Sequence, residues 1–383
     1  MEKERIGVNV LVTGGAGFIG THLVRRLLSE GCSVAVLDNF SSQVHATAQD
    51  LASDLTGQVR LFRGDVRDRE LVSRALNEQD VVVHLAAETG TGQSMYEVTR
   101  YQDTNIGGTA TILDVLVNDK RRSVKKLVVA SSRAVYGEGQ YRCAQHGSVY
   151  LGSRKLERLL AAKYDPICPV CENECVPEAS SEDCPLCPLS FYGLTKQVQE
   201  DMAALFAQTC GISSYALRYQ NVYGPGQSLT NPYTGILPIF SGLARSHSRI
   251  QIFEDGEESR DFIFIDDVVE ATWRFISEKR ELSGRYNVGT GARTTVLQVA
   301  NEIVRYFGSN AQISITGAFR QGDIRHNFAD VSKTRAAVGF TARCGFSEGL
   351  ERFLDWAGNQ GGHRPEAFQS SLREMTDRGL LRG

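Results

Sequence analysis

The sequence predicts an α/β protein in which helices cover both faces of a parallel sheet that is joined to a smaller second lobe. Three observations carry this prediction. Short β-branched runs alternate with longer amphipathic stretches, a glycine-rich turn follows the first run, and the pattern changes after about residue 222. Strict alternation of strand and helix implies right-handed crossovers and a sheet that is buried on both faces.

The predicted strands of this sheet are short and almost continuously apolar, as buried parallel strands are. In chain order they are VNVLVT (8–13), SVAVLD (33–38), VRLFRG (59–64), DVVVHLAA (80–87), KLVVASS (126–132) and SSYALRY (213–219). Helical spacing of apolar residues marks segments between and after them, at 21–30, 109–118 and 191–208.

Beyond about residue 222 glycine and proline become more frequent and the predicted strands shorten, as in IQIF and GRYNVG, with a helix over 294–307. We expect a first domain over 1–222 and a smaller α/β lobe, mainly over 223–360, that is interleaved with the first domain and closes a cleft against it. The polar segment 361–383 is expected to be a loosely held tail.

Composition limits the classes of function. With 383 residues and 42% hydrophobic content, the chain can bury one large core or two joined ones. A net charge of −3 and the lack of a basic run argue against nucleic-acid or membrane partners. The N-terminus lacks the features of a signal peptide, and no apolar stretch approaches the roughly 18 residues of a membrane span. We therefore expect a soluble, cytoplasmic protein.

The segment VLVTGGAGFIGTHLVRRLL predicts a dinucleotide site of the Rossmann type. Gly14, Gly17 and Gly20 lie at the turn from the first strand into the first helix, and Asp38 ends the next strand. Glycines let the backbone approach a pyrophosphate, the helix N-terminus favours its charge, and a carboxylate binds ribose hydroxyls. Because Asp38 would repel a 2′-phosphate, NAD is favoured over NADP. Asp65 and Val66 end the third strand, where they could contact the adenine of the cofactor.

Two further segments carry candidate catalytic groups. SSRAVYG (131–137) ends a strand, and YGLTK (192–196) opens a helix that places Tyr192 and Lys196 on one face. Lowering the pKa of a tyrosine from about 10 to about 7 takes roughly 4 kcal/mol, which a nearby ammonium and a nicotinamide cation could supply. Ser132 could hydrogen-bond the same substrate hydroxyl.

Together these motifs resemble the extended short-chain dehydrogenase/reductases, specifically the NAD-dependent nucleotide-sugar epimerase/dehydratase group. The resemblance runs from residue 8 to about 340 and includes GGAGFIG, GDVRD, HLAA (84–87), SSRAVYG, YGLTK, LRYQNVYGPGQ (217–227), SRDFIFIDD (259–267), YNVGTG (286–291) and GDIRHNFAD (322–330). It implies a homodimer and the catalytic set Ser132, Tyr192 and Lys196.

The resemblance also implies the binding residues. For NAD they are Gly14, Gly17, Phe18, Ile19, Asp38, Asn39, Asp65, Val66, Leu85, Ala86, Ala87, Tyr192 and Lys196. For a sugar-nucleotide substrate they are Glu88, Thr89, Arg133, Asn221, Arg260 and Arg325. Two arginines near a cleft suit a diphosphate through charge-assisted hydrogen bonds.

The residues after Ser132 bear on which reaction of this group is catalysed. By resemblance, 4,6-dehydratases carry an Asp-Glu pair there, whereas this chain has Arg133 and Ala134. A 4-epimerase needs no such pair, and the resemblance is strongest to dTDP-L-rhamnose 4-epimerase-type enzymes. The alternatives are a 4,6-dehydratase, a net sugar-nucleotide dehydrogenase, and a non-catalytic scaffold that binds NAD.

A cysteine-rich insertion over 138–188 separates the two catalytic segments. It contains CAQH (143–146), CPVC (168–171) and CPLC (184–187), and such short-spaced pairs are typical of tetrahedral zinc sites. The resemblance implies Cys143, His146, Cys168 and Cys171 as ligands. A competing set is Cys168, Cys171, Cys184 and Cys187, and disulfides or free thiols are the further alternative. Four protein ligands leave no open position, so the expected zinc is structural.

Overall fold

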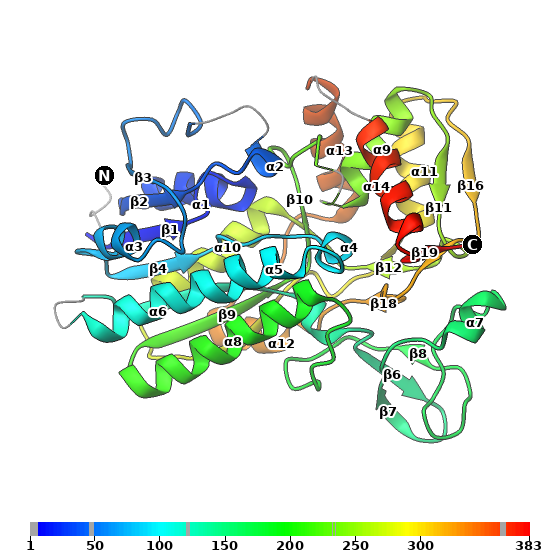
Figure 1. Cartoon of the computed structure of the whole chain (residues 1–383), viewed down its shortest axis with the longest axis horizontal. Coiled ribbons are helices and arrows are strands. Elements are labelled where there is room, and N and C mark those ends of the chain that lie inside the picture. Colours follow the sequence, from blue (N-terminus) through cyan, green and yellow to red (C-terminus); the bar gives the residue numbers. More distant parts are fainter. Residues whose placement is uncertain (1–6, 46–49, 120–122, 232, 234, 361–364) are drawn as a thin grey trace.

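A parallel sheet of seven strands forms the centre of the larger lobe (Figure 1). The computed structural model describes residues 7–45, 50–119, 123–231, 233, 235–360 and 365–383. In spatial order the strands are β14 (Gly284–Val288), β9 (Ser213–Tyr219), β5 (Lys126–Ser132), β4 (Val81–His84), β1 (Asn9–Thr13), β2 (Ser33–Asp38) and β3 (Arg60–Arg63).

The strand order reverses beside β1, and this reversal positions the site. From β1 the chain proceeds outward through β2 and β3, then crosses back to β4 on the other side of β1. Connections that leave β1 and β4 in opposite directions open a crevice at the carboxyl ends of these strands. The predicted parallel α/β sheet is therefore confirmed.

The seventh strand comes from beyond residue 222. Strand β14 pairs in parallel with β9, from Gly284 against Tyr215 to Val288 against Tyr219. The preceding helix α10 (Ile265–Ser277) packs against α1 (Phe18–Ser29). The chain thus leaves the sheet after β9, builds part of the second lobe and returns, so the two predicted segments share one sheet.

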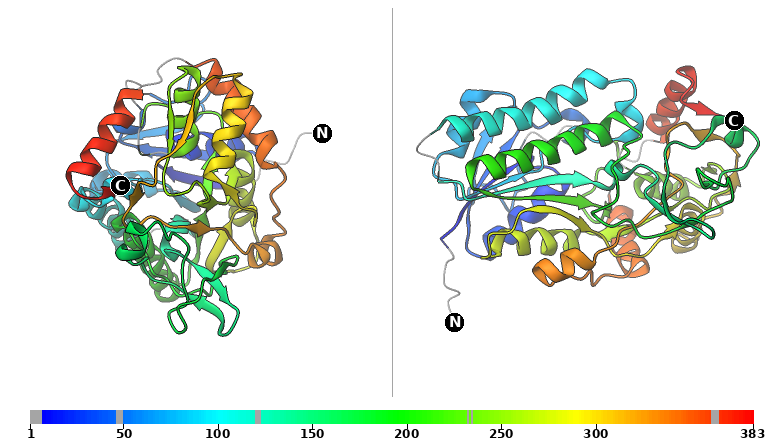
Figure 2. Two further views of the ribbon diagram at one scale, coloured as in Figure 1. Left: turned by 90° about the vertical axis from the view of Figure 1, so that its right-hand side faces the viewer. Right: turned by 90° about the horizontal axis from the view of Figure 1, so that it is seen from below.

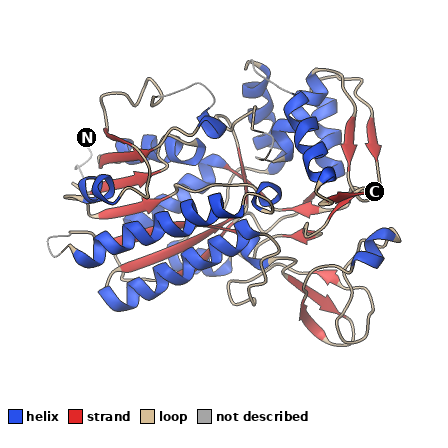
Figure 3. Cartoon of the chain, in the orientation of Figure 1, coloured by secondary structure: helices blue, strands red, loops and turns tan. Residues whose placement is uncertain are grey.

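Helices cover both faces of the sheet (Figures 1 and 3). Odd and even positions of β1 illustrate the division, because Val10 and Val12 pack in one core cluster and Leu11 in the other, all inaccessible to solvent. The first face carries α1, α10 and α12 (Ser332–Val338); the second carries α3 (Arg69–Leu76), α6 (Gly108–Asn118) and α8 (Phe191–Cys210). Shorter elements of this lobe are α2 (Ser42–His45), α4 (Thr91–Ser94), α5 (Val98–Tyr101) and the π-helix η1 (Gln102–Gly107).

The second lobe combines helices with short strand pairs. Its helices are α9 (Ile236–Arg245), α11 (Val296–Tyr306), α13 (Phe346–Gly358) and α14 (Pro365–Asp377). Its strands are β10 (Asn221–Tyr223) with β13 (Phe262–Phe264), β11 (Ile250–Ile252) with β16 (Ile313–Ile315), β12 (Ser259–Arg260) with β15 (Thr294–Thr295) and β18 (His326–Asn327), and β17 (Phe319–Arg320) with β19 (Leu381–Arg382). Among the described residues, no helix combines the length and apolar character that crossing a bilayer requires.

The insertion forms a small unit of its own beside the second lobe (Figure 2). It follows the 3-10 helix η2 (Arg133–Tyr136) and consists of β6 (Gln140–Cys143), β7 (Gly147–Tyr150), α7 (Leu156–Leu160) and β8 (Val176–Pro177). Strand β6 pairs antiparallel with both β7 and β8. The chain returns through a bridge between Ser180 and Ala329 before α8 begins.

The segment expected to be a loose tail folds instead. Residues 361–364 lie outside the described residues, but α14 packs against α9, and β19 pairs antiparallel with β17. Leu372 and Met375 are buried. With Phe368 they recur at spacings of four and three, which is the apolar face of a helix, and the polar average of the segment concealed this face.

Candidate active site

A cavity of ≈ 700 Å³ lies at the carboxyl ends of the sheet strands and holds most of the predicted site residues. We call it the cleft. The predicted residues that line it are Gly14, Gly17, Phe18, Ile19, Asp38, Asn39, Val66, Leu85, Ala86, Ala87, Glu88, Thr89, Ser132, Arg133, Tyr192, Lys196 and Asn221. Asp65, Arg260 and Arg325 are not part of its lining.

The glycine turn depends on the absence of side chains. Gly14 has a φ of +69°, and its N–H donates to the Leu37 carbonyl at 2.8 Å. A Cβ there would lie 2.7 Å from the Ala86 nitrogen, and one at Gly20 would lie 2.3 Å from the Gly14 carbonyl oxygen. Gly17, the N-cap of α1, has no side-chain capping bond. The first amides of α1 therefore meet the cleft without a competing acceptor from the cap, which suits a pyrophosphate.

Asp38, at the end of β2, is buried and oriented by the backbone. Its Oδ2 accepts from the Ala16 N–H at 3.0 Å and its Oδ1 from the Phe40 N–H at 2.9 Å. Oδ1 also faces His45 Nε2 at 3.4 Å, and Oδ2 keeps a further lone pair for a ribose hydroxyl. A phosphate would instead meet a buried carboxylate. The residues around this end of the cleft therefore fit NAD. Asp65 is bound instead to the Arg67 guanidinium, which holds the pKa of Asp65 below its usual value.

The candidate catalytic side chains come from two adjacent elements. Ser132 ends β5, and Tyr192 and Lys196 lie in the first turns of α8, where the Ser190 hydroxyl caps the helix by accepting from the Gly193 N–H at 3.1 Å. The Lys196 ammonium donates to the Ala130 carbonyl at 2.9 Å and lies 5.9 Å from the centre of the Tyr192 ring. The three predicted residues therefore meet beside the cleft.

The charges around Tyr192 set its acidity. Burial raises the pKa of Tyr192, while a hydrogen bond with Ser132 and the charge of Arg133 oppose that rise. Burial also lowers the pKa of Lys196 to about 7, against the charge of Glu200. In the protein alone, Tyr192 is therefore a protonated phenol whose ionisation requires additional positive charge nearby.

A group of partly or fully buried arginines lies next to this set. Arg133, Arg260 and Arg320 lie around Asp323. Burial raises the pKa of Asp323, but the charges of Arg260, Arg320 and Arg154 hold it below its usual value. Arg260 donates to Asp323 at 3.2 Å. Within the described part of the chain, NH1 of Arg133 and Nε of Arg320 are buried and have no hydrogen-bond partner. Unpaired buried donors are costly, so these nitrogens fit an oxygen-rich ligand.

Arg325, which the resemblance implied as a substrate residue, is held elsewhere. It lines a second cavity, of ≈ 500 Å³, between the insertion and the second lobe. Its guanidinium donates to Asp255 at 2.6 and 2.7 Å and to Asp165 at 3.0 Å. Arg320, five residues earlier, keeps a donor without a partner in the described ranges, and sequence reasoning missed it. Its place two residues before the GDIRHNFAD motif was the available signal.

Asn105 is a second residue that the sequence reasoning missed. It lies in the π-helix η1, is inaccessible to solvent, and holds the segment that lines the cleft after β4. Its Oδ1 accepts from the Glu88 N–H at 2.8 Å, and its amide donates to the Thr195 hydroxyl at 2.9 Å. Asn105 thus ties the Glu88 backbone to α8, one residue before Lys196. The Glu88 carboxylate itself pairs with Arg100 at 2.8 Å.

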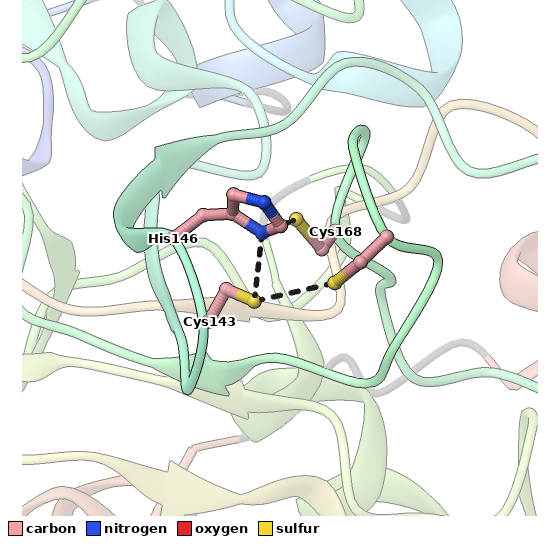
Figure 4. Close-up of side chains that lie close together, drawn as sticks. Cys143, His146 and Cys168 are labelled. Atoms are coloured by element: carbon pink, nitrogen blue, oxygen red, sulfur yellow. Dashed lines mark hydrogen bonds between the residues drawn. The ribbon is translucent and has the colours of Figure 1, made fainter.

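The insertion gathers four of its candidate ligands at one point (Figure 4). Cys143, His146, Cys168 and Cys171 bring one ligand atom each to within 4.8 Å of all the others. The Cys143 sulfur is 3.6 Å from His146 Nδ1 and 3.5 Å from the Cys171 sulfur. The Gln145 N–H points at the Cys143 sulfur and is the largest influence that lowers the pKa of this thiol to about 7. Backbone hydrogen bonds also lower the pKa of the Cys168 thiol. For Cys171 a backbone hydrogen bond lowers the pKa, but burial and the neighbouring Cys143 raise it more. Two of the three thiols are therefore shifted towards the thiolate, which is the form that binds metal.

The remaining cysteines of the insertion lie outside this group of four, at different places. Cys175 is buried against the cluster, and burial raises the pKa of its thiol to about 11. Cys184 packs with Val135 and Tyr136, and Cys187 is exposed. The structure therefore assembles the first of the two predicted ligand sets. The three cysteines of this set are free thiols.

Comparison with known proteins agrees with this geometry. The profile of the NAD dependent epimerase/dehydratase family matches residues 10–289. The chain is 37% identical, over 91% of its length and 95% of the relative's, to dTDP-L-rhamnose 4-epimerase from Burkholderia thailandensis. Among solved structures it is similar to MoeE5 in complex with UDP-glucuronic acid and NAD, with 30% identity, a TM-score of 0.73 and coverage of 91% of this chain and 99% of that one. It is also similar to the Thermus thermophilus UDP-glucose 4-epimerase in complex with NAD, with 28% identity, a TM-score of 0.72 and coverage of 92% and 100%. The chain belongs to the NAD-dependent epimerase/dehydratase family.

Proposed function

We propose that the protein is an NAD-dependent nucleotide-sugar 4-epimerase that acts on a dTDP-hexose such as dTDP-L-rhamnose. The observation that carries the proposal is a single cleft that runs from Asp38 and the glycine turn to Ser132, Tyr192 and Lys196. The 37% identical dTDP-L-rhamnose 4-epimerase supports the choice of sugar nucleotide. Bound in this cleft, NAD would accept the C4 hydride of the sugar and return it to the opposite face.

The chain's own residues handle the proton. Tyr192 is suited to take the O4 proton of the sugar, and Ser132 to hold that oxygen by a hydrogen bond. Arg133 lowers the pKa of Tyr192 by its charge, and Lys196 adds a second cation when it is protonated. The same proton returns to O4 when the reaction closes, so epimerisation leaves Tyr192 in its starting state.

The three clustered arginines suit the diphosphate of the substrate. Arg133, Arg260 and Arg320 face one carboxylate, Asp323, and two of them have a buried nitrogen without a protein partner. A diphosphate would supply both the negative charge and the missing acceptors. We therefore assign Arg320 to the role for which the sequence suggested Arg325.

The residues beside Ser132 favour epimerisation over dehydration. Loss of water between C5 and C6 needs an acid and a base of its own. Arg133 carries a cation and Ala134 carries no polar group, so the short helix after Ser132 provides no such pair. A net dehydrogenase and an NAD-binding scaffold have no observation of their own in their favour.

A panel of dTDP- and UDP-sugars, incubated with purified protein without added cofactor, tests the proposed activity. The expected product is an epimer of unchanged mass, formed without accumulation of NADH and without exchange of the C4 hydrogen with solvent. Loss of 18 mass units would show a dehydratase, and NADH formed with substrate would show a dehydrogenase. Tyr192→Phe should retain bound NAD and lose at least about 10²-fold in kcat; unchanged turnover would remove Tyr192 from the mechanism.

We also propose that Cys143, His146, Cys168 and Cys171 bind a structural Zn²⁺. In a tetrahedral site with bonds of about 2.3 Å, ligand atoms lie about 3.7 Å apart, close to the 3.5 and 3.6 Å in the cluster. Metal analysis should find one zinc per chain in the wild-type protein and in the exposed-thiol control Cys187→Ser. It should find none in Cys168→Ser, and a zinc-free wild type would contradict the assignment.

We propose, finally, that the protein is a homodimer. Helices α6 and α8 lie side by side and expose Val117 and Leu205, at 52% and 65% of their surface. Burying such apolar side chains between two copies would remove them from water. Light scattering of the purified protein should give twice the mass of the 42.1 kDa chain, and a monomer would contradict the proposal.

A further inference from the structure

The segment 365–383, in which the sequence suggested no functional residue, lies against the cleft. Helix α14 presents Glu374 to two tyrosines, Tyr233 in the lining of the cleft and Tyr96 beside it. Its Oε2 accepts from the Tyr96 hydroxyl at 3.2 Å and from the Tyr233 hydroxyl at 3.3 Å. The two hydroxyl oxygens are 2.9 Å apart. One carboxylate thus joins side chains that are 137 residues apart in the sequence.

Tyr233 connects this carboxylate to the cleft. It lines the cleft together with Thr89 and Gly90. Its Cβ lies 3.2 Å from the point where a side chain at Gly90 would begin, so the tyrosine rests directly on this turn. The position of Tyr233 therefore fixes one wall of the space beside the expected sugar contacts Glu88 and Thr89.

Met375, next to Glu374, contacts the same turn from α14. Its sulfur lies 3.3 Å from the point where a Cβ at Gly92 would be, and the side chain is buried. Arg378 stacks over the Tyr96 ring at 4.4 Å and pairs with Glu374 at 3.1 Å. Burial and the neighbouring negative charge raise the pKa of both tyrosines, so each remains a hydroxyl donor at neutral pH.

The end of the same segment supports the arginine cluster. Strand β19 pairs with β17, with Leu381 opposite Arg320. The Gln321 N–H donates to the Leu380 carbonyl at 3.1 Å. Residues 365–383 therefore contact both the turn after Glu88 and the strand that carries Arg320, which are the two sides of the proposed substrate site.

We infer that residues 365–383 complete the sugar-nucleotide site, with Glu374 as the positioning residue that fixes Tyr233 against the Gly90 turn. The inference rests on the proposed function, because it assigns a sugar nucleotide to this end of the cleft. Glu374 acts through Tyr233 and Tyr96 and does not take part in the chemistry. Its loss should therefore weaken substrate binding and leave the hydride and proton steps largely intact.

The test compares Glu374→Ala and Glu374→Gln with wild type. Glu374→Ala removes the acceptor that holds both tyrosine hydroxyls, so it should raise KM for the epimerised sugar nucleotide about tenfold or more. We expect kcat to change less than about twofold. Glu374→Gln keeps a carbonyl acceptor and should lie between the two, and Tyr233→Phe should raise KM in the same direction. The matched control is Asp377→Asn, an exposed acid on the same helix, which should match wild type.

Bound NAD and the Kd for the same sugar nucleotide, measured by calorimetry, accompany the kinetics. Unchanged KM and Kd in Glu374→Ala would overturn the inference. So would a fall in kcat or in bound NAD at unchanged KM, because that result indicates general structural damage. The binding measurement needs no turnover: a wild-type protein that binds a sugar nucleotide without epimerising it contradicts the proposed function, while the variant's Kd still decides the role of Glu374.

Discussion

The central sheet and the insertion are held together by different physical means. The strands of the sheet bury continuous apolar runs, such as Val10, Leu11 and Val12, between two layers of helices. In the insertion the buried apolar cluster is small, and three of its six fully buried members are Cys143, Cys168 and Cys175. A unit with so little apolar core depends on discrete bonds. The insertion can therefore fail while the sheet remains folded.

The insertion is also attached to the second lobe by buried charges. Arg154 pairs with Glu138 at 3.1 Å and with Glu254 at 2.7 Å, and all three side chains are at most 6% exposed. Arg325 extends this group to Asp165 of the insertion. The sheet should therefore tolerate the loss of single contacts because many contacts share its stability, whereas the insertion relies on a few groups, each of which can be tested.

Removal of the proposed zinc should have the largest effect, and only on the insertion. Structural zinc sites carry apparent binding energies of about 10–16 kcal/mol, more than a unit of this size can replace. After treatment with a chelator, hydrogen exchange should accelerate across β6, β7 and β8 and stay slow in β1, β4 and β5. The control Cys187→Ser should behave as wild type before and after chelation. Equal acceleration in sheet and insertion would show that the two regions do not differ as described.

Breaking the buried charge group should have the next largest effect. Arg154→Met leaves Glu138 and Glu254 without their shared cation, and such a loss typically costs about 3–5 kcal/mol. We expect this fall in the free energy of unfolding from urea titrations. Adding Glu254→Gln should recover part of it.

An exposed pair of the same insertion serves as the control for this measurement. Lys155 and Glu172 are 3.0 Å apart but 55% and 69% exposed. Lys155→Ala should therefore change stability by about 0–1 kcal/mol. If Lys155→Ala and Arg154→Met lower the free energy of unfolding by the same amount, burial does not explain the stabilising effect of the Arg154 group.

The sheet has an acid-sensitive point of its own at His84. Its ring nitrogens form hydrogen bonds with the hydroxyls of Thr13, at 2.7 Å, and Thr109, at 3.0 Å. Burial, together with the charge of Lys196, lowers the pKa of His84 from 6.5 to about 3. The folded state therefore binds this proton more weakly than the unfolded state. The stability gained from neutral His84 is present above about pH 6.5 and is lost as the pH falls towards 3, by about 2 kcal/mol at about pH 5.

Urea titrations of chelator-treated protein at about pH 7 and about pH 5 measure this loss without a contribution from metal binding at the proposed zinc site. His84→Gln, which keeps hydrogen-bonding atoms but has no titrating ring, should show a smaller fall between the two pH values. An equal fall in wild type and variant would mean that other groups account for the acid sensitivity of the sheet.

The sequence predicted the sheet well because its signal is local. The expected strands 33–38, 126–132 and 213–219 coincide with β2, β5 and β9, and the others differ by one to three residues at their ends. The glycine turn, Asp38 and the Ser132, Tyr192 and Lys196 set were found for the same reason. Each lies within a short motif whose spacing already fixes its geometry.

What the sequence did not predict depends on partners that are distant along the chain. Arg320 and Arg325 belong to one short segment. Acids at positions 165, 254 and 255 neutralise Arg325, whereas Nε of Arg320 has no hydrogen-bond partner among the described residues. Glu374 likewise gains its role from Tyr96 and Tyr233. Asn105 was missed because a single polar residue within a helical pattern carries no signal until its contacts are known.

The late arrival of β14 at the edge of the sheet has a consequence for how the protein is made. Strand β9 ends at Tyr219, and its partner residue Val288 is synthesised 69 residues later. At about 5–20 residues per second, the ribosome needs about 3–14 s for this stretch. Throughout that interval the nascent chain presents an unpaired strand edge to its surroundings. Chaperone demand and losses to aggregation during synthesis should therefore be set by this waiting time rather than by the stability of the finished enzyme.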